Sequence, residues 1–162
     1  MRRLHKAASA LLLAAAYLGG CSHAPPRLIP VGAASLDDPA RVARLSEGAK
    51  NPLLLRGLDH RPLKSLRTPA QWQDYDYVLT AGRHTLWLKS MPYVGYPYIL
   101  PQRIRCYVIE VELAGGMRYV LEEDHEARRA LLRDAESGAP LAFGPLVDEP
   151  WIFASDCRWP SS

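Results

Sequence analysis

Apolar and polar residues alternate along most of the chain after residue 52. Residues 107–113 carry apolar side chains at every odd position and glutamates at positions 110 and 112. Residues 75–80 and 85–89 alternate in the same way, and 53–58 form a short apolar run. Because successive side chains of a strand point to opposite faces of a sheet, this period of two predicts half-buried β-strands.

Turns that contain glycine separate these runs. Ala81-Gly82 lies between the runs 75–80 and 85–89, and Gly115-Gly116 leads from the run 107–113 into residues 117–122. Two alternating runs joined by a short turn with glycine are typical of a β-hairpin. The sequence therefore predicts two hairpins.

Residues 125–136 fit two structures. Most of them are good helix formers. However, residues 130–134, the pair Ser137-Gly138 and residues 141–143 also fit a strand, a turn and a second strand. We favour strands for this second part, because the neighbouring segments have the strand pattern.

The N-terminus has the pattern of a secretory signal peptide. A basic head at residues 2–6 precedes an apolar run at 7–18, which is shorter than the roughly 20 residues of a membrane-spanning helix. Leu18-Gly19-Gly20-Cys21 resembles the lipobox of bacterial lipoproteins, in which the cysteine is lipidated and becomes the first mature residue. The resemblance implies a signal peptide at 1–20 and an acylated Cys21. The alternative is an ordinary exported protein cleaved near Gly20.

Residues 21–50 are interpreted as a tether for a β-sandwich domain at 51–162. Prolines at positions 25, 26 and 30 favour extended, solvated backbone. Asp38-Pro39 before residues 40–47, with Gly48 after them, has the capping pattern of one short helix. A helix of this length needs to dock onto the domain to be stable.

The pattern gives about seven short strands in one domain, which is typical of small all-β folds. We therefore expect a mainly β fold, as a small antiparallel β-sandwich or a partly open barrel. Residues 78–88 resemble the strand–turn–strand core of PEGA-like β-sandwich modules in small lipoproteins of Gram-negative bacteria. Gly82 and His84 match that pattern, whereas Ala81 stands where a proline is usual. The resemblance implies a sandwich, a surface location and a structural His84 that bonds to nearby backbone, and it brings no catalytic residues.

The cysteines indicate one structural disulfide. With Cys21 assigned to lipid, Cys106 and Cys157 remain, and an exported protein meets an oxidising compartment. A bridge between them closes a loop of about 50 residues and contributes roughly 4 kcal/mol in the chain-entropy model. It is expected to hold the C-terminal tail, which includes Trp151 and Trp159, against the strand of Cys106.

The charge of the chain does not indicate a nucleic-acid partner. Three of its 20 basic residues lie in the signal peptide, so 17 remain against 17 acidic residues. A mature chain without net charge lacks the basic excess that attracts phosphate backbones.

Sequence motifs of common enzymes are not found. The chain has no G-x-S-x-G, no P-loop and no dinucleotide-binding motif. His125-Glu126 begins like a zincin helix, but Arg129 replaces the second metal ligand, so we expect solvated surface. Glu110 and Glu112 are expected on the exposed face of one strand. The sequence therefore predicts no catalytic residue, no cofactor and no metal site.

The best candidate for recognition is the segment 91–101. It contains three prolines together with Tyr93, Tyr96 and Tyr98. Prolines interrupt strand pairing, and tyrosine offers a large contact area with few rotatable bonds. An exposed loop of this composition is expected to contact a partner. The alternative is that it folds over an open end of the domain and completes the core.

Together these features predict a lipid-anchored protein of the cell envelope that binds or scaffolds a partner without catalysis. Ser22 follows the lipidated cysteine. By resemblance to the sorting rule of enterobacterial lipoproteins, this serine implies the outer membrane, facing the periplasm. The expected partners are the membrane, through the lipid, and another envelope protein. The alternative function is that of an envelope hydrolase inhibitor or stress-response accessory protein.

Overall fold

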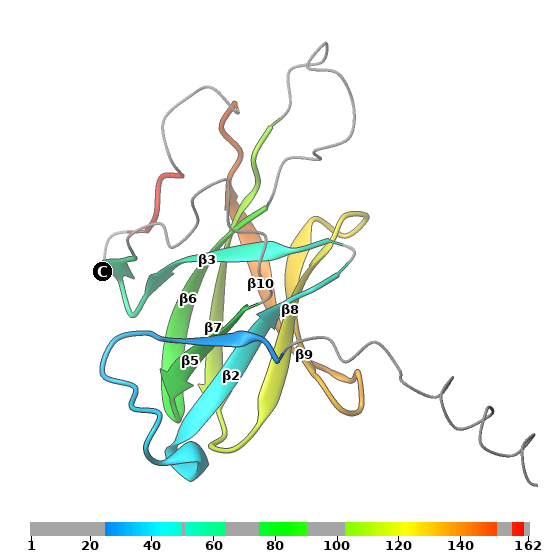
Figure 1. Ribbon diagram of the computed structural model, residues 1–162. Coiled ribbons are helices and arrows are strands. Elements are labelled where there is room, and N and C mark those ends of the chain that lie inside the picture. The colour runs from blue at the N-terminus through cyan, green and yellow to red at the C-terminus, as the bar shows by residue number, and fades with distance from the viewer. Residues whose placement is uncertain (1–24, 50, 64–74, 91–102, 152–156, 161–162) are drawn as a thin grey trace, which may run out of the picture.

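The computed structural model shows one curled β-sheet (Figure 1). Its described residues form ten strands, and no helix among them is long and apolar enough to cross a membrane. The mainly β fold and the partly open barrel expected from the alternation are confirmed. The described residues are 25–49, 51–63, 75–90, 103–151 and 157–160. The elements are β1 (Arg27–Pro30), the 3-10 helix η2 (Pro39–Arg41), β2 (Val42–Glu47), β3 (Leu53–Leu58), β4 (Arg61–Pro62), β5 (Tyr75–Thr80), β6 (Gly82–Ser90), β7 (Cys106–Leu113), β8 (Arg118–Asp124), β9 (Arg129–Asp134) and β10 (Pro140–Asp148).

The sheet forms a half-barrel with two walls. The strand order is β1-β5-β2-β8-β9-β10-β7-β6-β3-β4. We call β1, β5, β2, β8 and β9 the first wall and β7, β6, β3 and β4 the second wall; β10 joins them. The pairs β1–β5 and β2–β8 are parallel and the other described pairs are antiparallel, so the sheet is mixed. Strand twist accumulates across a sheet of this size and curls it.

The two predicted hairpins are wrong, although their strands are present. β5 pairs with β1 and β2, whereas β6 pairs with β3 and β7. In the same way β7 pairs with β6 and β10, whereas β8 pairs with β2 and β9. The turns at Ala81-Gly82 and Gly115-Gly116 therefore carry the chain from one wall to the other. Alternation identifies a strand and its buried face, but the partner is chosen by the packing of distant strands.

β1 and β2 belong to the sheet, so the predicted tether and its helix are wrong over residues 27–30 and 42–47. Asp38 does cap a helical turn, because its carboxylate accepts a hydrogen bond from the Ala40 N–H (3.2 Å). The turn ends at Arg41, and the chain continues as β2 between β5 and β8. The inward side chains of Ala43 and Leu45 in β2 are fully buried, and this burial outweighs a weak helix preference. The β domain predicted at 51–162 therefore also includes 27–47.

Residues 125–136 resolve in favour of strands. After a turn at 125–128, β9 pairs with β8 on one side and with β10 on the other. The strand, turn and strand predicted for 130–143 are confirmed.

Apolar side chains from both walls fill the inside of the half-barrel. The odd-numbered residues of β7 lie inside, where Tyr107 and Ile109 are fully buried. Glu110 and Glu112 are exposed on the outer face, as predicted. The interior is therefore a packed core. Other fully buried members of this core are Leu45, Leu53, Leu79, Leu86, Leu88, Leu121 and Leu132.

Backbone contacts close one end of the half-barrel, which we call the corner end. Here η2 lies against the two turns that cross between the walls (Figure 1, bottom). The Ala81 N–H donates to the Arg41 carbonyl and the Gly116 N–H donates to the Val42 carbonyl, both at 2.8 Å. A Cβ at Gly115 would overlap the Ala40 carbonyl oxygen, so this close approach requires glycine.

Candidate functional site

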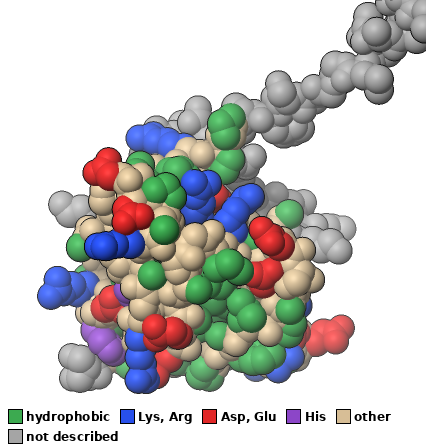
Figure 2. Space-filling model, turned by 90° about the horizontal axis from the view of Figure 1, so that it is seen from below, with side chains coloured by type: hydrophobic (Ala, Val, Ile, Leu, Met, Phe, Trp, Pro, Cys, Tyr) green, Lys and Arg blue, Asp and Glu red, His purple; other side chains and the backbone are tan. Residues whose placement is uncertain are grey.

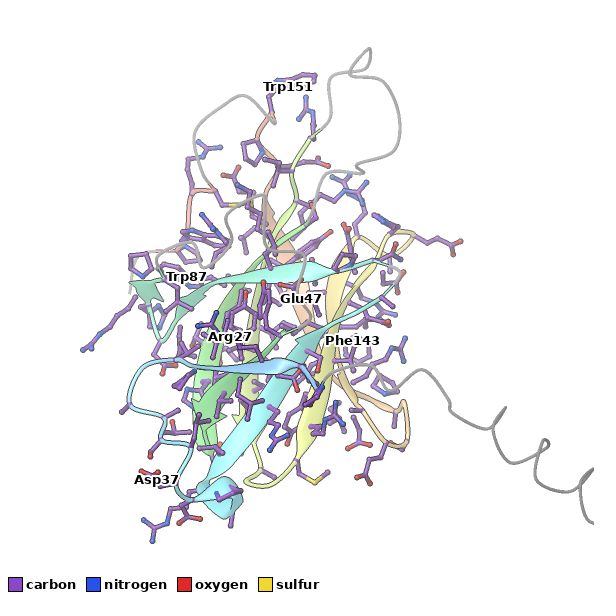
Figure 3. All side chains as sticks on the ribbon, in the orientation of Figure 1. Arg27, Asp37, Glu47, Trp87, Phe143 and Trp151 are labelled. Carbon is purple, nitrogen blue, oxygen red and sulfur yellow. A yellow bond between two sulfur atoms is a disulfide. The ribbon has the colours of Figure 1, made fainter. Side chains whose placement is uncertain are left out.

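A two-stranded ribbon projects from the opposite end, which we call the ribbon end. Beyond the ends of β7 and β10, Arg103 pairs with Trp151 in an isolated bridge, and the Ile104 N–H donates to the Pro150 carbonyl (2.9 Å). We call residues 103–105 and 149–151 the ribbon. Trp151 lies far out on it (Figure 3) and is 46% exposed, and the Arg103 guanidinium stands 4.5 Å from the centre of its ring. A cation over an indole face orients both groups.

A buried carboxylate lies at the base of the ribbon. The Glu123 side chain is only 3% exposed, and one of its oxygens accepts hydrogen bonds from the Tyr107 hydroxyl and from Arg105 Nη1 (2.9 Å). Burial raises the pKa of Tyr107, and the hydrogen bond to Glu123 raises it further. A charge taken out of water is tolerated when it is paired and hydrogen-bonded, and Glu123 meets this condition.

The network extends outward to the surface. Arg105 Nε donates to Glu149 (3.3 Å), and Glu149 also pairs with Arg128 (2.6 Å). Arg105 Nη1 lies 2.8 Å from His125 Nδ1. The same His125 Nδ1 also lies 3.3 Å from a Glu123 carboxylate oxygen. The arrangement joins six side chains at the strand ends that carry the ribbon: Arg105, Tyr107, Glu123, His125, Arg128 and Glu149.

The chemistry of this network is structural. Its carboxylates accept from donors within the chain, while the ribbon presents an aromatic ring and a guanidinium to solvent. Among the residues that the structure describes, no three His, Cys, Asp or Glu side chains are grouped as metal ligands. The exposed groups are suited to recognition, since tryptophan and arginine are enriched where interfaces are strongest.

The residues proposed to contact a partner lie outside the described residues. These are Tyr93, Tyr96 and Tyr98, and Cys21 with the signal peptide is also outside. The segment 91–102 nevertheless starts and finishes at the ribbon end. The Ser90 N–H donates to the Arg105 carbonyl (2.8 Å), and the Arg105 N–H donates to Ser90 Oγ (2.9 Å). The predicted recognition segment therefore joins the chain beside Arg103.

The predicted disulfide between Cys106 and Cys157 is confirmed, with Cα atoms 6.0 Å apart. It holds residues 157–160 on the outer face of the second wall, where Trp159 stacks on Trp87 at a centroid distance of 5.3 Å. The Asp148 carboxylate accepts hydrogen bonds from the Arg158 N–H (2.8 Å) and from the Arg158 guanidinium. The tail predicted to pack does so at Trp159, whereas Trp151 is exposed.

His84 has the structural role predicted for it, at the corner end. Its Nε2 lies 2.8 Å from the Thr80 carbonyl oxygen, and its Nδ1 lies 2.9 Å from an Asp59 carboxylate oxygen. Nε2 also lies 3.4 Å from the Thr80 hydroxyl, so both ring nitrogens of this buried side chain have polar partners. The hydrogen bonds fix the turn at Ala81 between β5 and β6.

The remaining candidates lie on the surface. His125 and Glu126 are exposed in the turn after β8, as predicted from the sequence. Glu110 lies on the outer face of β7 in an exposed pair with Arg83 (3.1 Å). Of these three residues, only His125 reaches the network at the base of the ribbon, through its contact with Arg105.

The sequence reasoning missed Glu123 and Arg105. One signal was present: Glu123 follows Tyr119 and Leu121 at the inward positions of β8, so a charged residue occupies an apolar phase. A charge at an inward position requires a buried partner. The partner, Arg105, is not predictable because β7 and β8 are not neighbours.

No family model, curated protein or solved structure matches this chain. The PEGA-like resemblance of residues 78–88 stays a prediction. The candidate site therefore rests on the geometry of its own residues.

Proposed function

We propose that this protein is a lipid-anchored module of the bacterial cell envelope that binds a partner protein through its ribbon end. The observation that supports the binding role is the exposed Trp151–Arg103 pair on a ribbon that directly continues into the segment 91–102. Aromatic and arginine side chains on a projecting, hydrogen-bonded ribbon offer contact area with little entropy to lose. We include Tyr93, Tyr96 and Tyr98, which lie in this segment of the sequence, among the proposed contact residues.

The lipid anchor is supported by the N-terminal sequence, with its basic head, short apolar run and the Leu-Gly-Gly-Cys motif. The folded sheet begins at Arg27, six residues after Cys21. Six residues span about 20 Å when fully extended. Acylation of Cys21 therefore holds the sheet close to the bilayer surface, which raises its effective concentration toward a membrane or envelope partner.

The binding role is tested by replacing the three tyrosines with serine, and separately by Trp151→Ala, in the full chain. We expect in-cell cross-linking to one envelope protein to be lost, with an unchanged melting temperature. Leu36→Ser is the matched control, because Leu36 is an exposed apolar residue near the corner end. A large fall in melting temperature for the tyrosine variant indicates instead that the segment completes the core. Retained cross-linking in both variants contradicts the proposal.

The anchor is tested separately by mass spectrometry of the purified chain and by Cys21→Ser. We expect an acylated N-terminal residue 21 in the wild type, and a soluble or uncleaved product in the variant. An unacylated soluble wild type contradicts the anchor and leaves the binding role of the ribbon end to be judged by its own experiment.

A further inference from the structure

β10 pairs with the first wall along its first half and with the second wall near its end, which leaves an opening in the sheet. Its first half, Pro140–Pro145, pairs with β9, whereas only Leu146 and Asp148 pair with β7. The crossing point is Gly144, where a Cβ would overlap Ile109 and the Val108 carbonyl. Beyond this point the second half of β7 has β6 on one side and no described ladder partner on the other.

The opening contains a groove of about 550 Å³, a size typical of ligand sites. Its floor is apolar, because Val111, Tyr119 and Ala142 belong to or pack against the core. Figure 2 views the molecule from the corner end. On this face hydrophobic side chains gather in one area, with acidic side chains beside them. The residues that line the groove are Glu110, Val111, Glu112, Ala114, Met117, Tyr119, Asp134, Leu141 and Ala142.

Backbone groups of β7 point into this opening. The Ser90 N–H bonds to the Arg105 carbonyl, and successive pairs of an antiparallel ladder alternate between bonded and non-bonded. The odd-numbered residues of β7 therefore direct their N–H and C=O groups toward β6. Those of Glu110 and Glu112 point the opposite way, where an added strand would pair with them.

The rim of the groove is acidic. It carries Glu110, Glu112 and Asp134, and hydrogen bonds from Ser137 hold the pKa of Asp134 below its usual value, so this carboxylate is ionised at neutral pH. Arg83 pairs with Glu110 at 3.1 Å and compensates one of the three charges. Charge complementarity therefore favours a cationic ligand.

We propose that this opening binds an extended peptide segment of a partner protein, in which basic and apolar side chains alternate, as an added strand beside β7. Apolar side chains of the segment face inward over Val111 and Tyr119. Basic side chains face outward beside Glu110 and Glu112, because cross-strand neighbours share a face. This site is separate from the ribbon end and does not depend on the proposed function.

The test uses the purified full chain and a fluorescein-labelled hexapeptide of alternating lysine and valine, with binding followed by fluorescence anisotropy. We expect saturable binding that weakens as salt is raised. The double variant Glu110→Gln, Glu112→Gln should weaken it at least tenfold. Both side chains are exposed, so the fold tolerates the change. Glu126→Gln, an exposed glutamate in the turn before β9, is the matched control and should leave binding unchanged.

Two further peptides separate strand addition from other modes of binding. Methylation of alternate backbone nitrogens that face β7 should abolish binding, because it removes ladder hydrogen bonds. A lysine–serine peptide of the same charge should bind at least tenfold more weakly. Equal binding of either peptide, an unaffected double glutamine variant, or no binding of the lysine–valine peptide overturns the proposal. A concentration-dependent dimer that the double variant dissociates assigns the groove to a second copy and also overturns it.

Discussion

At the corner end the half-barrel is closed by backbone, whereas at the ribbon end it is closed by charged side chains. Carbonyl and N–H groups of η2 meet the two crossing turns directly, and Gly115 leaves no space for a side chain. At the ribbon end, Glu123, Arg105 and Tyr107 span between β7 and β8 through side-chain atoms. The backbone closure is sensitive to added volume, and the side-chain closure is sensitive to ionisation.

This difference supports the place that we propose for recognition. Backbone closure fixes the turns that connect the walls and so determines the strand order. Side-chain closure leaves the strands of the ribbon free to continue outward beyond the sheet and to carry Trp151 into solvent. Binding residues on projections from a rigid scaffold are a common arrangement.

The largest expected effect is that of Gly115→Ala at the corner end. Its methyl group would overlap the Ala40 carbonyl oxygen, and no flexible side chain is available to move aside. We expect the free energy of unfolding to fall by about 3 kcal/mol, in the range of overpacking changes. Urea denaturation followed by tryptophan fluorescence measures this loss.

Ala114→Ser is the control for this variant. Ala114 is the neighbouring residue and is exposed, so the change should move the free energy of unfolding by less than about 0.5 kcal/mol. If Gly115→Ala is as stable as the wild type, the corner end is not closed by backbone contact and the comparison fails.

A smaller effect is expected from Tyr107→Phe at the ribbon end. The variant keeps the buried ring but removes the hydroxyl that donates to Glu123, which should cost about 1 to 2 kcal/mol at pH 7. Because burial and then Glu123 raise the pKa of Tyr107, the folded state retains this proton to higher pH than the unfolded chain. The stabilisation is therefore complete below pH 10 and decreases as the pH rises above it.

The measurement is urea denaturation of both proteins at pH 7, 10 and 11. The difference in unfolding free energy between wild type and Tyr107→Phe should narrow as the pH rises above 10. A difference in unfolding free energy that stays constant to pH 11 contradicts the raised pKa of Tyr107. The ribbon end would then not be sensitive to the ionisation of this side chain.

The sequence was informative about strands and faces because these depend on local period. The inward residues of β7 follow from alternation alone, and strands were favoured for the region of β9 because its neighbours have the strand pattern. The disulfide followed from the count of cysteines left after Cys21. Each of these inferences needs a short window of sequence or the chemistry of one residue type.

The strand partners and the ribbon end were not predictable in the same way. The turn at Gly82 has the local pattern of a hairpin, yet it connects the two walls because β2 and β7 take the neighbouring positions. The segment before β2 carries a helix cap at Asp38, which is satisfied within the single turn of η2. Glu123 and Arg105 meet only because the sheet curls, and no local pattern encodes this curl.

The smallest expected effect is that of Asp59→Asn, which tests whether the corner end depends on charge at all. Asp59 accepts hydrogen bonds from His84 and from the Thr85 N–H. Burial alone would raise its pKa, but these hydrogen bonds outweigh that effect and lower it. Asparagine tolerates the positive φ of 49° at this position, so the change isolates the charge.

A lowered folded pKa means that the stabilisation by Asp59 is present above about pH 4 and is lost as the pH falls through the folded value. The side chain is 48% exposed, so the loss at pH 7 should stay below about 1 kcal/mol. In denaturation experiments at pH 7, 4 and 2.5, the difference in unfolding free energy between Asp59→Asn and the wild type should become smaller in acid. The exposed control Asp37→Asn should keep the same difference from the wild type at all three pH values. A loss at pH 7 as large as that of Gly115→Ala would show that an ion pair, rather than backbone contact, closes the corner end. The contrast between the two ends would then disappear, since both would depend on charged side chains.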